Sequence, residues 1–347
     1  MEYRDLERRL TRLSAEMKLG QDAVEKTIRM SEILDRICSD SRLSYLAFKG
    51  GTALNFVYLK KLKRLSVDLD FNAIGKKKEL LDLRDNAMDT ALREAAEVMG
   101  YEVEIDKSYF RYSYHFLYDR LDGAEDYIKV EISFRDRVAV LPLKLSKFRF
   151  SGSGKSIQVR TLSFVEMLAE KLRALYTRES GRDLFDVFNA LEMVTPRMEP
   201  ILRKSLIYKL FRATPPSVFD PGDFLKKINN FQEKRYAQAL TGFVSEENQV
   251  PFELARARTA KVLEFIRKID AKDTMYIGLF RCLLGQNVSK EMINKIRDEK
   301  GLARPLNYLF DAKSITKMAR LTELSDVLPT QEIPFKKYPW LNELIQQ

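Results

Sequence analysis

The sequence has very few histidines and cysteines, so sites built from these side chains are largely excluded. It contains one histidine, two cysteines and one tryptophan in 347 residues. A single histidine, His115, cannot form a histidine-based metal site, and Cys38 and Cys282 lie too far apart to show the spacing of a zinc ligand set. We therefore expect the two cysteines to be reduced, structural thiols.

Long apolar runs are missing as well. No stretch of 18 or more apolar residues occurs, and the first residues, MEYRDLERRLTRL, carry charges where a secretory signal would be apolar. The sequence therefore predicts a cytoplasmic protein that does not use a membrane.

Charge is abundant and unevenly distributed. The chain has a net charge of +10; residues 1–200 hold 35 basic and 33 acidic side chains, whereas residues 201–347 hold 25 and 17. A basic second part beside a near-neutral first part favours a module that binds a polyanion, although a basic surface without a partner would look the same. The charge shift and the pairs Pro215-Pro216 and Pro221-Gly222 place a boundary between 190 and 220, and we set the domains at 1–200 and 201–347.

Hydrophobic periodicity changes along the chain. Residues 4–40 show helical spacing, and strand-like segments then alternate with helices up to about residue 160. From Leu162 onward the pattern is helical, and Ser163 with Glu166 three residues later is typical of a capping box. The pattern predicts an α+β domain with a mixed sheet, followed by a helical carboxy-terminal domain.

A glycine turn lies between a predicted strand, 45–48, and a predicted helix, 52–59. The turn reads Lys49-Gly50-Gly51-Thr52. Glycines allow a ligand to approach the backbone closely, and the free N–H groups at a helix start bind phosphate. The same sequence could be a turn without a ligand.

Asp68 and Asp70 follow in an apolar strand context. Period-two alternation points both carboxylates to one face of the strand. The commonest function of such a pair is to bind Mg²⁺ or Mn²⁺ together with substrate phosphates. Glu131, in the strand-like segment 127–134, becomes a third metal ligand if its strand adjoins that of Asp68. An exposed edge strand would explain the two aspartates, and surface alternation would explain Glu131.

These segments resemble a known family. KGGTALNFVY followed by SVDLDF resembles the signature of minimal nucleotidyltransferases in the DNA polymerase β superfamily, and more narrowly the AbiEii/AbiGii abortive-infection toxins and the related MenT-type toxins. EMLAEKLRAL at 166–175 and RDLFD at 182–186 are similar to that family's later motifs. The interval from Ala53 to Val67 is longer than is usual in the family.

The resemblance implies a polymerase-β-like nucleotidyltransferase and a role for each matched residue. Backbone near Gly51, the Thr52 hydroxyl and Lys171 would hold the triphosphate, Ser66 would support the phosphates or the metal, and Asp68 and Asp70 would bind the metal. Asp186 would complete the site as a base or a metal-shell residue, with Asp183 as the alternative. Arg182 is a possible additional member.

The family also implies a function. The chain would be the toxin of a toxin–antitoxin or abortive-infection system, transferring nucleotides from an NTP to RNA, with the tRNA acceptor end as the expected substrate and an antitoxin protein as a partner. Two alternatives stay open. One is nucleotidyl transfer to a small molecule or a protein, and the other is a catalytically idle protein that binds RNA or a partner.

Overall fold

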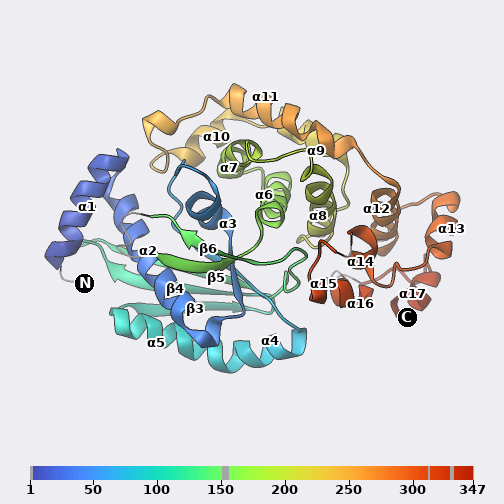
Figure 1. Cartoon of the computed structure of the whole chain (residues 1–347), viewed down its shortest axis with the longest axis horizontal. Helices are drawn as coiled ribbons and strands as arrows, with labels where there is room; N and C mark the ends of the chain where they lie inside the picture. Colours follow the sequence, from blue (N-terminus) through green and yellow to red (C-terminus); the bar gives the residue numbers. More distant parts are fainter. Residues whose placement is uncertain (1–2, 151–155, 312, 329–331, 347) are drawn as a thin grey trace.

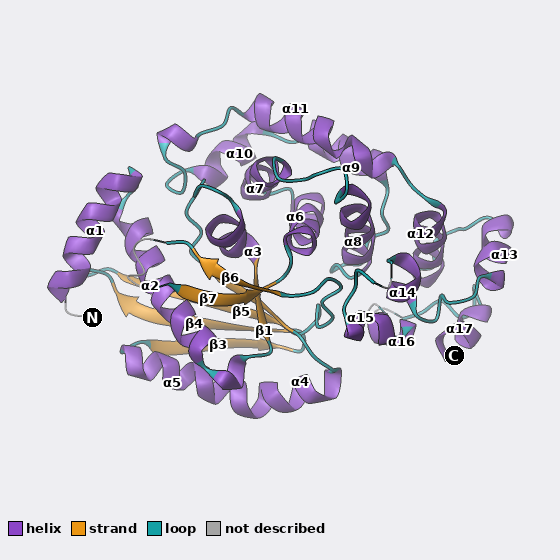
Figure 2. Ribbon diagram, in the orientation of Figure 1, coloured by secondary structure: helices purple, strands orange, loops and turns teal. Residues whose placement is uncertain are grey.

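A computed structural model describes residues 3–150, 156–311, 313–328 and 332–346 (Figures 1 and 2). It confirms a mixed α+β fold with a helical carboxy-terminal part. The strands are β1 (Leu46–Lys49), β2 (Leu69–Ala73), β3 (Glu102–Ser108), β4 (Arg111–Asp119), β5 (Glu125–Ser133), β6 (Lys144–Phe148) and β7 (Ile157–Thr161). The helices of the first half are α1 (Tyr3–Met17), α2 (Gln21–Ser39), α3 (Gly50–Ala53), α4 (Lys77–Leu83), α5 (Asp89–Met99), α6 (Phe164–Arg178) and α7 (Gly181–Leu191).

The remaining chain is helical throughout its described part. Its helices are α8 (Glu199–Phe211), α9 (Pro221–Asn229), α10 (Glu233–Leu240), α11 (Phe252–Val262), α12 (Ala271–Leu283), α13 (Lys290–Asp298), α14 (Pro305–Leu309), α15 (Lys317–Leu321), α16 (Leu324–Val327) and α17 (Trp340–Gln346). No helix in the described ranges is both long and apolar enough to cross a membrane.

The seven strands form one mixed sheet in the order β3-β4-β5-β2-β1-β7-β6. β2 runs parallel to β5 and β1 parallel to β7, while the other neighbours are antiparallel. The register places Lys49 opposite Asp70, and Asp70 opposite Glu131. Helices α4 and α5 lie along one side of the sheet, and α3, α6 and α7 lie on the other (Figure 1).

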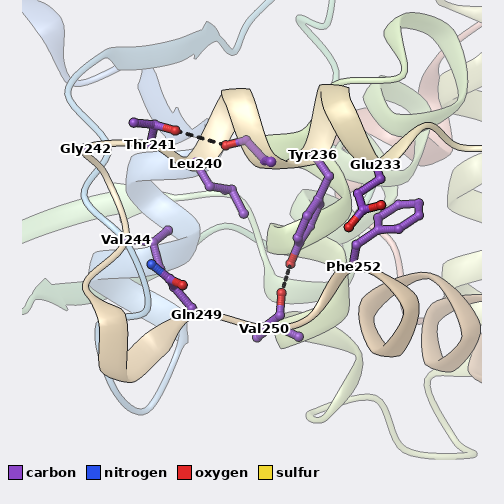
Figure 3. Close-up of a pocket in the computed structure, with 10 residues that line it drawn as sticks. Glu233, Tyr236, Leu240, Thr241, Gly242, Val244, Gln249, Val250 and Phe252 are labelled. Carbon is purple, nitrogen blue, oxygen red and sulfur yellow. Dashed lines mark hydrogen bonds between the residues drawn. The ribbon is translucent and has the colours of Figure 1, made fainter.

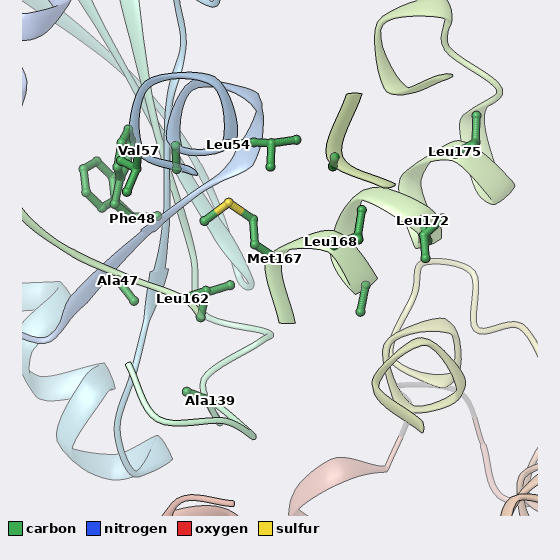
Figure 4. Close-up of a cluster of buried hydrophobic side chains, with 14 of the residues drawn as sticks. Ala47, Phe48, Leu54, Val57, Ala139, Leu162, Met167, Leu168, Leu172 and Leu175 are labelled. Carbon is green, nitrogen blue, oxygen red and sulfur yellow. The ribbon is translucent and has the colours of Figure 1, made fainter. Parts of the chain in front are cut away.

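Apolar packing fixes the position of α6 against the central strands. Met167 and Leu168 of α6 are buried near Phe48 of β1 and near Leu54 and Val57, which follow α3 (Figure 4). Ser163 caps α6 by accepting the Glu166 amide at 3.4 Å, as the capping pattern predicts. The Glu166 carboxylate has a different role from the one expected of a capping box, because it accepts the backbone amides of Val140 and Leu141 at 3.1 and 2.9 Å.

Three local details differ from the sequence-based expectation. Strand β6 was not anticipated, and β2 begins only at Leu69, so Leu65 to Asp68 lie outside the paired strand. The helix after the glycine turn begins at Gly50 and changes into a π-helical turn over Leu54–Tyr58.

The carboxy-terminal part is joined to the first part by buried charges. Lys209 of α8 is fully buried, and its ammonium lies 3.0 Å from Glu166 and 2.8 Å from Glu170 of α6. Burial opposes the charge of Lys209, but Glu170 and Glu166 attract it more strongly and raise its pKa. The division of the chain at residue 200 stays a prediction.

Candidate active site

Each glycine of the turn is required by a close approach of another side chain. Gly50 has a φ of +81°, and a Cβ added there would lie 2.2 Å from Oδ2 of Asp70. A Cβ on Gly51 would lie 2.5 Å from Nη2 of Arg64 and 3.3 Å from Oδ2 of Asp186. Any other residue at either position would clash, so the pair brings the backbone of the α3 start against two sets of charged groups.

Thr52 connects the turn to the first aspartate. Its side chain is fully buried, and Oγ1 lies 2.5 Å from the Asp68 carbonyl and 2.9 Å from Oγ of Ser66. The hydroxyl therefore holds the backbone that carries Asp68, rather than facing open solvent where a triphosphate would bind. Phosphate contact by Thr52 and Ser66 stays a prediction, and the contacts favour a positioning role for both.

Asp70 lies in an environment that disfavours a bare carboxylate. Burial raises its pKa to about 6, and the negative charges of Glu131 and Asp68 add to the rise against the attraction of Lys49. Within the described ranges, the carboxylates of Asp68 and Asp70 form no hydrogen bond or ion pair, although both side chains are partly buried. A pair of acids arranged this way gains stability from a cation.

Glu131 adjoins Asp70 in the sheet register, so the expected neighbourhood of the strands is confirmed. Its carboxylate already has cationic partners: Lys129 donates to it at 2.7 Å and Arg111 lies 3.8 Å away. Among the described residues, no three or more His, Cys, Asp or Glu side chains cluster closely enough to hold a metal ion. Mg²⁺ is commonly held by one or two carboxylates together with substrate phosphates, so Asp68 and Asp70 fit such an ion without a third acid. A ligand role for Glu131 stays a prediction.

Lys171 and Asp186 meet in a buried ion-pair cluster beside the glycine turn. The Lys171 ammonium lies 2.9 Å from Oδ2 of Asp186 and 3.1 Å from Oδ1 of Asp183. Arg64 donates two hydrogen bonds of 2.7 Å to Asp186 from the other side, and Asn55 donates a third at 3.1 Å. Burial alone would raise the pKa of Asp186, but Arg64 and Lys171 hold it well below its usual range.

Asp183 and Asp186 therefore have similar surroundings. Asp183 is fully buried and also accepts two hydrogen bonds from Arg178, at 2.5 and 2.9 Å. Arg178 is 62% exposed, so one cation of the cluster reaches solvent at the site. Arg182 is exposed and lies over the ring of Phe243, with Cζ 5.5 Å from the ring centre, so it does not contact the buried acids.

Lys49 links the turn to a second buried network. Its ammonium lies 3.5 Å from Glu170, which also accepts a hydrogen bond from Asn72 at 3.0 Å and pairs with Lys209. Burial would raise the pKa of Glu170, but Lys209 and Lys49 lower it to about 2. Lys49 is thus held between Asp70, its partner in the register, and Glu170.

Sequence reasoning missed several members of this site. Arg64 ends the basic run at 60–64, which looks like an exposed loop, yet its side chain is only 3% exposed. Arg178 could have been found, because it follows Lys171 by seven residues and two helical turns bring it to the same face. The partners Asn55 and Lys209 leave no local signal, because their contacts join segments far apart in the chain.

Several basic residues of the carboxy-terminal part, which is expected to bind a polyanion, are already paired. Lys227 lies 3.8 Å from the centre of the Tyr176 ring, and Arg235 pairs with Glu179 at 3.3 Å. Arg256 pairs with Glu253 and Arg258 with Glu192. The lysines at 226, 234 and 261 are exposed. The basic excess of this part is therefore partly used in internal contacts.

A cavity of about 400 Å³ lies between α10 and the chain that follows it (Figure 3). The Tyr236 hydroxyl donates to the Val250 carbonyl beside it at 3.1 Å. Glu233 is the charged residue of its lining, so the cavity does not suit a polyanion. The chain beside the cavity contacts the candidate site at Phe243, whose carbonyl accepts the amide of Leu65 at 2.8 Å.

Comparisons with known proteins identify the family and the fold. The family described as nucleotidyl transferase AbiEii toxin, type IV toxin–antitoxin system, matches residues 32–261. The solved structure of MenT4, a nucleotidyltransferase toxin from Mycobacterium tuberculosis H37Rv, aligns with a TM-score of 0.61 and 19% sequence identity, covering 89% of this chain and 99% of that one. At this identity the likeness shows a shared fold. No curated protein sequence matches the chain.

Proposed function

The chain belongs to the AbiEii family of nucleotidyltransferase toxins of type IV toxin–antitoxin systems, and from this premise we propose that it transfers a nucleotide from an NTP to the end of an RNA, with the tRNA acceptor end as the expected substrate. One observation carries the proposal. The carboxylates of Asp68 and Asp70, which form no hydrogen bond or ion pair within the described residues, lie beside the glycine turn, and burial together with the charges of Glu131 and Asp68 raises the pKa of Asp70 to about 6.

The triphosphate would lie across the turn. The Gly50 and Gly51 backbone can approach phosphate oxygens closely, and the α3 start directs amide groups toward them. Arg178 is exposed at the edge of the cluster and can add a charged hydrogen bond to the leaving phosphates. Lys171 is held nearby by Asp183 and Asp186 and keeps its positive charge, because their attraction raises its pKa.

The reaction needs charge neutralisation more than it needs a strong base. The terminal hydroxyl of the acceptor attacks the α-phosphorus, one P–O bond forms, one breaks, pyrophosphate leaves, and the hydroxyl proton passes to solvent. Asp68 and Asp70 would hold Mg²⁺ or Mn²⁺, which supplies electrostatic stabilisation of the phosphates when bound. Asp186 is occupied by Arg64 and Lys171, so we assign it the positioning of Lys171 rather than the acceptance of a proton.

A direct assay tests the proposal. The full chain is incubated with a tRNA pool, Mg²⁺ and each of four labelled NTPs, and the label is followed in RNA, protein and small-molecule fractions. We expect label in RNA that depends on metal, and at least about a hundredfold less label with Asp70→Asn. Glu131→Gln serves as the matched carboxylate variant and measures whether that residue is a metal ligand. Label found exclusively in small molecules or protein would contradict the RNA assignment, and no label anywhere would contradict the activity.

A toxin of this class works with an antitoxin protein, and we expect one for this chain. Co-expression of the chain with its cognate antitoxin should relieve toxicity in cells. Growth inhibition by the wild-type chain but not by Asp70→Asn would connect toxicity to nucleotidyl transfer. Equal growth inhibition by the wild-type chain and by Asp70→Asn would show that toxicity does not depend on nucleotidyl transfer.

A further inference from the structure

A second cavity lies at the end of the sheet, away from the glycine turn. It has a volume of about 490 Å³, and its lining comes from α4, the β3–β4 hairpin, the chain after β5, the residue after α8, and α16 with the chain that follows it. We call it the hairpin cavity. Volumes of this size are typical of sites that hold a nucleotide-sized ligand.

The hairpin cavity carries an excess of positive charge. Its lining includes Lys77, Arg135, Arg137 and Arg212 but a single acid, Asp326. Asp326 pairs with Arg137 at 2.9 Å. Arg212 directs its terminal nitrogens to backbone carbonyls, including that of Arg135 at 2.9 Å, and these carbonyls do not cancel its charge.

The arginines also act on one another. Burial lowers the pKa of Arg135, and the positive charge of Arg212 lowers it further. Charges of one sign gathered in a partly enclosed space gain stability when an anion enters. Arginine suits phosphate in particular, because its planar fork can donate two hydrogen bonds to one phosphate group.

Aromatic side chains line the same cavity. Tyr109, at the hairpin tip, is 57% exposed, and its ring meets that of Phe110 edge to face at 4.7 Å. Phe110 lies in turn under the Arg135 guanidinium, at 4.9 Å. An exposed ring next to cations is the arrangement with which proteins stack a base of single-stranded nucleic acid while binding its phosphate.

The chain that continues β5 connects the candidate carboxylates to the hairpin cavity. Glu131, the register partner of Asp70, is four residues before Arg135, so their Cα atoms lie at most about 14 Å apart. An RNA strand whose end lies at Asp70 could therefore run along β5 and place one of its preceding nucleotides in the cavity. The triphosphate is expected at the glycine turn, which leaves the cavity to the other substrate.

We propose that the hairpin cavity binds a nucleotide of the acceptor RNA, with its phosphate held by Lys77, Arg135 and Arg137 and its base stacked on Tyr109. The inference rests on the proposed function for the identity of the strand. The chemistry it requires is a single-stranded phosphodiester with an accessible base. A free NTP offers related chemistry, and the experiment separates the two.

Binding of a short fluorescent single-stranded RNA to the full chain, without NTP or metal, tests the cavity independently of catalysis. Tyr109→Ala should weaken binding by about fivefold to a hundredfold, the range measured for loss of one stacked base. Lys77→Ala should weaken it and reduce the slope of log affinity against log salt by about 0.7. Lys78→Ala is the matched control, because Lys78 is an exposed neighbour that does not line the cavity.

The outcomes are distinct. Equal binding by Tyr109→Ala, Lys77→Ala and Lys78→Ala would overturn the cavity assignment while RNA labelling by the wild type would still support the proposed function. Binding that depends on Tyr109 without any labelling of RNA would support the cavity and contradict the proposed function. Displacement of the RNA by ATP, with the same loss of ATP affinity in Tyr109→Ala, would assign the cavity to a free nucleotide and overturn the RNA assignment.

Discussion

Replacing Arg64 with methionine should damage both stability and activity, although Arg64 belongs to none of the motifs. Arg64 donates two hydrogen bonds of 2.7 Å to Asp186 and one of 2.8 Å to the Leu65 carbonyl. The side chains of Arg64 and Asp186 are 3% and 0% exposed, so water cannot replace the donors that the substitution removes. Methionine leaves Asp186 with Lys171 and Asn55 alone.

The expected loss follows from the burial of the pair. Removing one partner of a buried ion pair costs about 3–5 kcal/mol, because the other charge stays buried without compensation. For a chain of 347 residues that unfolds as one unit, this lowers Tm by about 4–7 °C. Lys171 should also be drawn more firmly to Asp186, which lowers kcat/KM for nucleotidyl transfer.

A double-mutant cycle distinguishes this pair from general loss of packing. Asp186→Leu alone should be strongly destabilising, but Arg64→Met with Asp186→Leu should cost less than the two single changes together, since no unpaired charge then remains between them. Thermal and urea unfolding measure all three variants. Lys61→Met, an exposed neighbour in the same loop, is the control. If Arg64→Met melts within about 1 °C of that control, or the two changes are additive, the pair does not stabilise the fold as argued.

Three further predictions concern the metal site, the thiols and the buried network. Asp68→Asn should reduce nucleotidyl transfer by at least about a hundredfold. The free energy of unfolding should stay within about 1 kcal/mol of wild type, because loss of the Asp68 charge relieves its repulsion from Asp70. A normal rate of transfer would reject Asp68 as a metal ligand. Burial raises the pKa of Cys38 to about 12 and of Cys282 to about 11. Iodoacetamide at pH 8 should therefore modify either thiol in the folded chain at least about a hundredfold more slowly than free cysteine. Rapid modification would show that these thiols are not buried. The pKa of Glu170 is lowered to about 2, so its contribution to stability is present above its ordinary pKa of about 4.5 and is lost as pH falls toward 2. The Glu170→Gln variant should therefore be less stable than wild type at pH 7 and should lose less stability on acidification. An acid unfolding curve equal to that of wild type would contradict this.

The family and the overall architecture could be predicted from the sequence, because their signals are local. A glycine pair between a strand and a helix is a pattern that the geometry of the chain converts directly into a turn. Two aspartates separated by one residue predict a shared face in the same local way, although β2 begins only at Leu69, after Asp68. The register places Glu131 opposite Asp70, which meets the condition on which its ligand role depends, while the role itself stays a prediction. The Ser163 cap is local for the same reason, since it joins residues three apart.

Tertiary structure decided which charges are buried and what each one contacts. Arg64 and Asp186 are 122 residues apart, and Lys209 reaches Glu170 across 39 residues, so no periodicity could join them. Two basic side chains of the same loop differ, Lys61 being exposed and Arg64 buried, since burial depends on which segments fold over the loop. Sequence by itself therefore determined the turn and the strand faces, where neighbours along the chain set the geometry. The ion pairs that hold Lys171 and Lys49 depend on distant helices, because a buried charge is stable only where the fold brings its partner.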